Sequence, residues 1–162
     1  STAELALVRF DDVEEARPLF ADLAYGCVLG LDDLESALAI FTRSATTDLS
    51  IANRLRHAAK LVNERRGAEA LKVVEGVEAN TDALPSIQVA ARLDIGDLAG
   101  AYQWADGRED VGLTYELAYA LYDAKKWSEA EKLFARCCPQ LNDDDCTVLH
   151  ELAKQAVMST DN

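Results

Sequence analysis

Proline and turn dipeptides are scarce in this chain. Three prolines occur in 162 residues, no hairpin dipeptide lies between alternating apolar runs, and valine and isoleucine recur at helical spacing. Low-complexity segments and linkers rich in glycine, serine or proline are also missing. These absences argue against strands, and they predict one continuous all-α domain over residues 1–162.

The chain also has few positively charged residues and no long apolar run. Lysine and arginine number 16 against 29 aspartates and glutamates, which gives a formal charge of −13. Nonspecific binding to nucleic acid or to an anionic membrane requires the opposite surplus. The longest uncharged stretch around the first apolar run, Leu23 to Leu31, is too short to span a bilayer and lacks the flanks of a signal peptide. We therefore expect a cytoplasmic protein without membrane insertion.

Cysteine occurs four times, and two of the four are adjacent. This arrangement is not the framework of a small secreted domain, so reduced thiols are expected. The metal-like group is Cys137, Cys138, Cys146 and His150, and zinc would need all four as donors. Their spacing lacks the usual pair separated by two to four residues, and no orienting group or oxyanion donor for catalysis is apparent. We predict no cofactor and no catalytic residue, and metal binding by this group stays an open alternative.

The clearest pattern is the stretch 111–139, which predicts two short amphipathic helices folded back on each other. The first helix has Leu117, Ala118 and Leu121 on one face, and the second has Trp127, Ala130, Leu133 and Phe134. Small alanines fall where two antiparallel helices come close, and larger residues lie one turn away. Such a pair cannot bury its own faces, so further copies must stack on it.

Earlier parts of the chain repeat this pattern with a shrinking period. The equivalent alanines are Ala37, Ala70, Ala101 and Ala130, which are 33, 31 and 29 residues apart. The predicted helices are 13–29, 34–41, 49–63 and 68–74, followed by the third unit at 84–105, with Pro18 near the start of the first helix or at a break before it. A helix at 144–158 is expected to cap the open end, and residues 1–10 form a leader or a short first helix.

This organisation resembles the tetratricopeptide repeat superfamily over about residues 18–138. The resemblance implies a right-handed solenoid of about four helix pairs whose first helices line a concave, partner-binding groove. Transferring that position by position gives the predicted partner-binding residues Tyr25, Leu55, Ala59, Ile87, Ala91, Tyr115, Tyr119 and Tyr122. The protein would then be a non-catalytic scaffold that binds a peptide segment of a protein partner.

The three tyrosines of the stretch 111–123 are the most distinctive groove candidates. Tyr115, Tyr119 and Tyr122 fall on a face separate from the buried stripe and offer large, rigid contact surfaces. The alternative is that they pack between neighbouring helices. The groove is apolar and acidic, so it does not suit the capture of an acidic peptide tail.

A basic segment stands out in this acidic chain. It consists of Arg54, Arg56, Lys60, Arg65, Arg66 and Lys72. It predicts either a solvated helix face or a positive patch that receives an acidic partner.

A narrower resemblance concerns the segments 96–104 and 115–130. The runs GDLAGAYQW and YELAYALYDAKKWSEA look like the N-terminal repeat domain of the seventy-two-kilodalton protein of the signal recognition particle, whose groove holds a segment of its sixty-eight-kilodalton partner. The alternative among binding proteins is a type III secretion chaperone, which is similar in being small, acidic and built of these repeats. A zinc protein or enzyme that uses the cysteine and histidine group is the alternative of another class. The partner, the oligomeric state and whether this is a whole protein are not fixed by the sequence.

Overall fold

The computed structural model describes residues 17–78, 83–105 and 110–160, and within these ranges all regular secondary structure is helical. The α-helices are α2 (Arg17–Gly30), α3 (Leu34–Arg43), α4 (Ile51–Asn63), α5 (Gly67–Val73), α6 (Ala83–Asp94), α7 (Leu98–Ala105), α8 (Val111–Asp123), α9 (Trp127–Leu141) and α10 (Asp144–Thr160), with a 3-10 turn, η2, at Thr46–Asp48. The all-α prediction is confirmed for this part of the chain. The predicted leader at residues 1–10 lies outside the described residues.

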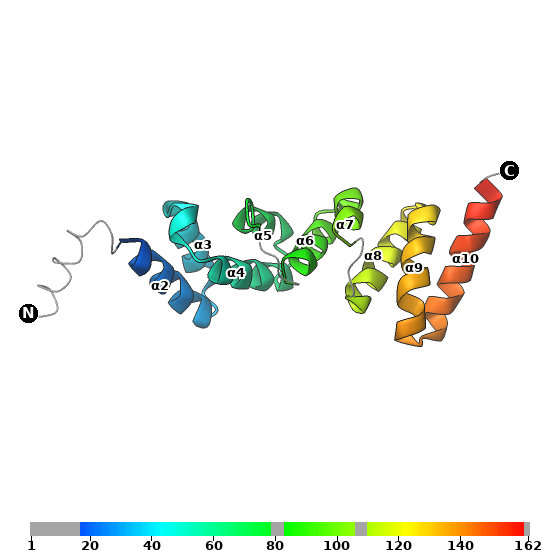
Figure 1. The fold of residues 1–162 in the computed structure, drawn as a ribbon, viewed down its shortest axis with the longest axis horizontal. Helices are drawn as coiled ribbons and strands as arrows, with labels where there is room; N and C mark the ends of the chain where they lie inside the picture. The colour runs from blue at the N-terminus through cyan, green and yellow to red at the C-terminus, as the bar shows by residue number, and fades with distance from the viewer. Residues whose placement is uncertain (1–16, 79–82, 106–109, 161–162) are drawn as a thin grey trace, which may run out of the picture.

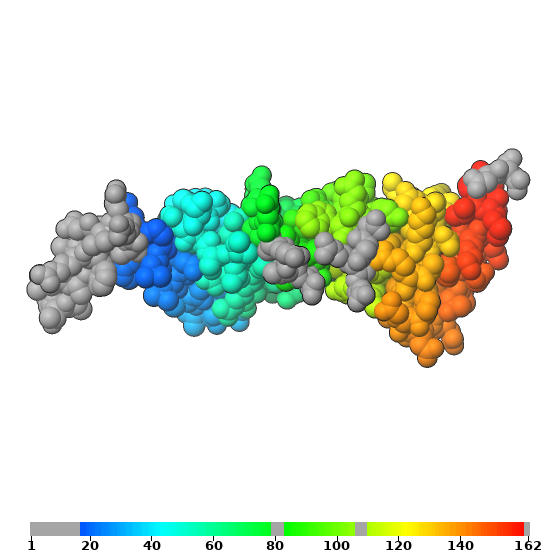
Figure 2. Space-filling view, in the orientation of Figure 1, coloured from blue at the N-terminus to red at the C-terminus, as the bar shows by residue number. Residues whose placement is uncertain are grey.

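The helices follow one another along the long axis of an elongated molecule (Figure 1). Each of α2, α4, α6 and α8 packs against the helix that follows it, and α2, α4, α6 and α8 also contact one another in sequence. The helix α10 packs on α9 at the C-terminal end. The space-filling view has the same chain order on its visible face, from α2 at one end to α10 at the other (Figure 2).

The four helix pairs are joined by the same type of turn. The residues Asp32, Arg65, Gly96 and Lys125 all have positive φ, between 57° and 77°, and each lies two residues before the second helix of its pair. In each turn this residue donates its N–H to the carbonyl three residues back, and the next residue donates to the carbonyl five residues back. These two bonds define the Schellman helix end, so four turns of different sequence have one geometry.

Small residues allow the two helices of each pair to approach closely. Ala37, Ala70, Ala101 and Ala130 are all fully buried, and each donates its N–H to the carbonyl of the residue after the positive-φ position. On α8, Ala118 is fully buried as well. The burial that the helical period predicts at these positions is therefore found in every pair.

Local details of the helix ends differ from expectation. The helix predicted from residue 49 begins at Ile51, because residues 46–48 form η2 and the Ser50 hydroxyl caps α4 by accepting the Asn53 N–H at 3.2 Å. Pro18 lies in the first turn of α2. The helix α9 continues past Pro139 to Leu141, and its C-cap is Asn142, which has φ 50°. Among the described helices, none is long and apolar enough to cross a membrane.

The shared turn predicts that Lys125→Gly stabilises the fold by about 0.5–1 kcal/mol. A left-handed backbone strains an L-residue by roughly 1–2 kcal/mol and glycine hardly at all, and part of this gain is offset by the greater freedom of glycine in the unfolded chain. Urea unfolding of the variant measures the change. Gly96→Ala is the reciprocal control and should lose stability, and a destabilised Lys125→Gly would contradict the role given to this turn.

Candidate binding surface

The exposed aromatic residue of α8 is Tyr119, whose side chain is 52% exposed. Its two neighbours on the helix are partly buried against α9. Tyr122 stands edge-on to Trp127 at 5.0 Å between ring centroids, and both Tyr115 and Tyr122 stand edge-on to Phe134 at 6.2 and 6.3 Å. The ring packing fixes the two flanking tyrosines, while Tyr119 projects its ring to solvent.

The α8 surface lies in an acidic environment. Burial raises the pKa of Tyr115 above its usual value, and the negative charges of Asp143 and Asp145 raise it further. Those two carboxylates belong to the turn before α10 and to its first helical turn. On α8 itself, Glu116 is exposed beside Tyr115. The surface that α8 presents near α10 therefore combines aromatic rings with carboxylates.

The remaining groove candidates differ widely in exposure. Ala59 on α4 is exposed, whereas Leu55, Ile87 and Ala91 are buried in the core cluster between α4 and α6. Tyr25 on α2 is fully buried. Of the eight predicted residues, Ala59, Tyr115, Tyr119 and Tyr122 therefore have surface to offer a partner in this structure, and the four buried ones serve the core.

Tyr25 is buried because its hydroxyl has a partner inside the molecule. The Tyr25 hydroxyl lies 2.7 Å from His57 Nδ1, and the two rings stand edge-on with their centroids 5.4 Å apart. Burial, with a smaller contribution from the positive charge of Arg66, lowers the pKa of His57 to about 4. The imidazole is therefore neutral at pH 7, and its Nδ1 can accept a hydrogen bond from the Tyr25 hydroxyl. The spacing of Tyr25 and Leu29, one helical turn apart, places both on one face of α2 and could have predicted that Tyr25 is buried with Leu29.

Arg54 of the basic segment is a structural residue rather than part of a surface patch. Its side chain is buried, and its guanidinium donates to the carbonyl oxygens of Val73 at 2.8 Å and Glu75 at 2.7 Å. These carbonyls lie at the C-terminal end of α5 and just beyond it, where a helix has no intrahelical donors left. Arg54 thus ties α4 to the end of its partner helix.

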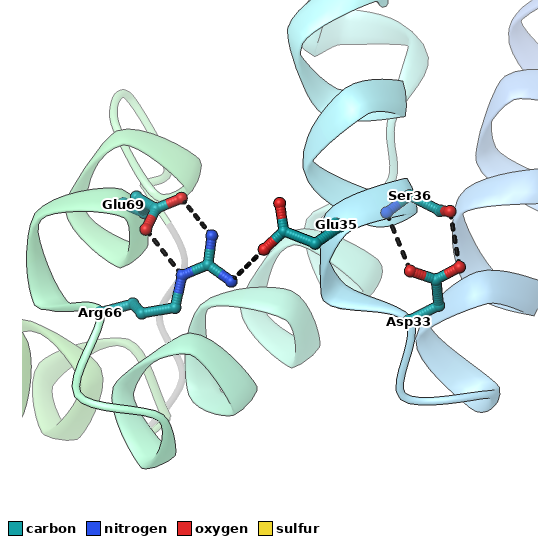
Figure 3. A network of polar contacts seen from close by, with 5 residues as sticks. All are labelled: Asp33, Glu35, Ser36, Arg66 and Glu69. Carbon is teal, nitrogen blue, oxygen red and sulfur yellow. Dashed lines mark hydrogen bonds and ion pairs between the residues drawn. The ribbon is translucent and has the colours of Figure 1, made fainter.

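Two further cations of the basic segment are paired with carboxylates from other parts of the chain. Arg66 donates to Glu69 at 2.7 Å and to Glu35 at 2.6 Å, which links the start of α5 to α3 (Figure 3). Lys60 pairs with Asp32 in the turn between α2 and α3. These ion pairs use part of the positive charge that the sequence grouped together. Arg56, Arg65 and Lys72 are the exposed members.

The cysteine group is organised differently from the expected set of reduced thiols. Cys138 near the end of α9 and Cys146 in the first turn of α10 form a disulfide, so the prediction of reduced thiols is wrong for this pair. Antiparallel packing of α10 on α9 brings the two helix ends together across the turn 142–143, which is the physical reason. His150 lies apart from the sulfurs and contacts Glu131 at 3.3 Å.

The third sulfur of this group belongs to Cys137, a buried free thiol. Its Sγ lies 4.0 Å from the Sγ of Cys146, and the three sulfurs lie within 4.8 Å of one another. Burial raises the pKa of the Cys137 thiol. Metal ions bind thiolates, whereas two of these three sulfurs are bonded to each other, so the disulfide form does not supply three thiolate donors.

Comparison with known proteins yielded no match to this chain among protein-family models, curated proteins or solved structures. The function is therefore inferred from the residues and their arrangement.

Proposed function

We propose that the helix pairs form a right-handed solenoid of tetratricopeptide-like repeats, capped by α10, that serves as a non-catalytic scaffold in the cytoplasm. The observation that supports this most strongly is the recurrence of one pair geometry. Four Schellman turns and four buried alanines recur at the same shrinking interval, and the first helices form a continuous row of contacts. In repeat proteins such a row builds an extended surface for binding a partner.

The partner in this proposal is a peptide segment of another protein, and α8 supplies its main anchor. Tyr119 is the half-exposed aromatic on that helix, and the packing of Tyr115 and Tyr122 against α9 holds the surface around it rigid. A rigid aromatic loses little conformational entropy on binding, which makes it an efficient contact residue. Ala59, exposed on α4, extends the proposed surface towards the N-terminal pairs.

The proposed partner class is a protein segment of the signal recognition particle. It rests on the resemblance of the segments 96–104 and 115–130, which fall on α7 with its preceding turn and on α8 with the start of α9. The decisive experiment is a pull-down with the immobilised chain, followed by mass spectrometry. Recovery of particle proteins would support this class, and recovery of unrelated proteins would replace it while leaving the scaffold proposal in place.

Tyr119→Ala is expected to weaken the binding of the recovered partner by about 2 kcal/mol, which raises the Kd roughly 30-fold. Folding should change little, because the ring is half exposed and lies outside the buried stripe of α8. Affinity is measured by calorimetry with the recovered partner, and the melting temperature is measured on the same sample.

A matched control is Lys132→Ala, which truncates an exposed side chain on the neighbouring helix α9. It should leave both quantities unchanged. A large loss of stability in Tyr119→Ala together with unaltered affinity would overturn the anchor role and favour packing between helices.

A further inference from the structure

The junction between α9 and α10 places a free thiol next to a disulfide. Cys137 is 1% exposed, Cys138 is 6% exposed and Cys146 is fully buried. The disulfide joins Cys138 to Cys146, while the Sγ of Cys137 lies 4.0 Å from the Sγ of Cys146. This separation is close to contact between two sulfur atoms. Because Cys137 Sγ also lies within 4.8 Å of Cys138 Sγ, it faces the side of the S–S bond, and an in-line attack on Cys146 requires a rotation of the Cys137 side chain.

We propose that Cys137 is the internal nucleophile of a thiol–disulfide exchange that moves the bridge from Cys138–Cys146 to Cys137–Cys146. The Cys137 thiol gives its proton to solvent, and the resulting thiolate attacks Cys146 Sγ. The Cys137–Cys146 bond forms while the Cys138–Cys146 bond breaks. Cys138 leaves with the electron pair as a thiolate and takes up a proton, so no oxidant or reductant is consumed.

The position of the sulfurs decides which bond is exchanged and what the exchange achieves. Cys146 is the sulfur that Cys137 approaches, and it remains the anchor on α10 in both forms. The attachment on α9 moves by one residue, which corresponds to about 100° around the helix axis. The thiol released belongs to Cys138, which is the most exposed of these three buried residues. The exchange therefore moves the free thiol from one buried residue to its slightly more exposed neighbour.

Cys138→Ser tests whether Cys137 can replace Cys138 as the bridge partner. The experiment uses the full chain with Cys27→Ser, because Cys27 is an exposed thiol. The folded protein is oxidised with oxidised glutathione, quenched with acid, alkylated and mapped by mass spectrometry. The expected product is a Cys137–Cys146 disulfide in a yield similar to that of the parent bridge. Free thiols at both residues, under conditions that fully oxidise the parent, would overturn the proposal.

The Cys27→Ser parent tests the exchange in the presence of all three sulfurs. The native protein is incubated with N-ethylmaleimide for increasing times, quenched with acid and mapped by fragmentation of the peptide that contains both adjacent cysteines. Label on Cys138 as well as on Cys137 is expected, and an absence of label from Cys138, with or without label on Cys137, would overturn the exchange. Cys137→Ser is the control and should take up no label at Cys138 or Cys146. Circular dichroism verifies the helical content of each variant, and the parent experiment decides if Cys138→Ser does not fold.

Discussion

Gly67→Ala is expected to destabilise the protein by about 2–3 kcal/mol. Gly67 opens α5, and a methyl group at this position would lie 2.4 Å from the carbonyl oxygen of Ala91 and 2.9 Å from the Asp94 side chain. The first contact is with backbone, so it is relieved only if α5 moves away from α6. That movement would also weaken the 2.7 Å hydrogen bond from the Gly67 N–H to the Asp94 carboxylate. Urea unfolding of the variant and the parent measures the loss.

Gly112→Ala provides the matched control for this substitution. Gly112 lies in the first turn of α8, and among the described residues an added methyl group would meet only an Asp110 carboxylate oxygen, at 3.9 Å. The change should be neutral or should stabilise by up to about 1 kcal/mol through helix propensity. Equal unfolding midpoints for Gly67→Ala and the parent would show that α5 and α6 are not held at the contact distance described here.

The stability of the protein should contain a pH-dependent contribution from His57 of about 3 kcal/mol. Burial lowers the pKa of His57 from 6.5 to about 4 in the folded state. The folded protein therefore favours the neutral imidazole, and the unfolded chain takes up a proton at this residue more readily. The contribution is fully present above pH 6.5, and it is lost progressively as the pH falls from 6.5 to about 4.

His57→Gln isolates this contribution from the many carboxylates that also titrate in acid. The amide oxygen can accept the Tyr25 hydroxyl in place of Nδ1, and the side chain does not titrate. The difference in free energy of unfolding between parent and variant should shift in favour of the variant as the pH falls from 7 to 4. A difference that stays constant over this range would mean that His57 titrates normally in the folded protein.

Much of the helical register was predictable because it depends on local spacing. An alanine on the inward stripe of a second helix must face the first helix of its pair, whatever the rest of the chain does. Ala37, Ala70, Ala101 and Ala130 follow this rule and are fully buried. The common Schellman geometry of the four turns could not be predicted from the sequence, because an aspartate, an arginine, a glycine and a lysine occupy the same backbone position.

The candidate site was less predictable, because exposure depends on how neighbouring pairs stack. A groove position on a first helix is exposed or buried according to how the next first helix packs against it. The packing of α2, α4 and α6 on one another buries Tyr25, Ile87 and Ala91. Tyr119 lies at the same kind of position, but it remains half exposed. Local periodicity separates the two faces of a helix, and it carries no information on the angle between successive pairs.

The sequence by itself determined that the chain is helical, where the helices begin and end to within a few residues, and which small residues lie at the crossings, since each follows from the 3.6-residue period and the turn chemistry. Tertiary structure alone decided the contacts between residues that are distant in sequence. The Tyr25–His57 hydrogen bond and the ion pairs of Lys60 with Asp32 and of Arg66 with Glu35 join residues 28 to 32 positions apart. One repeat separates these partners, so they meet only when the pairs stack, and the folded chain thereby pairs cations that the sequence presented as a patch.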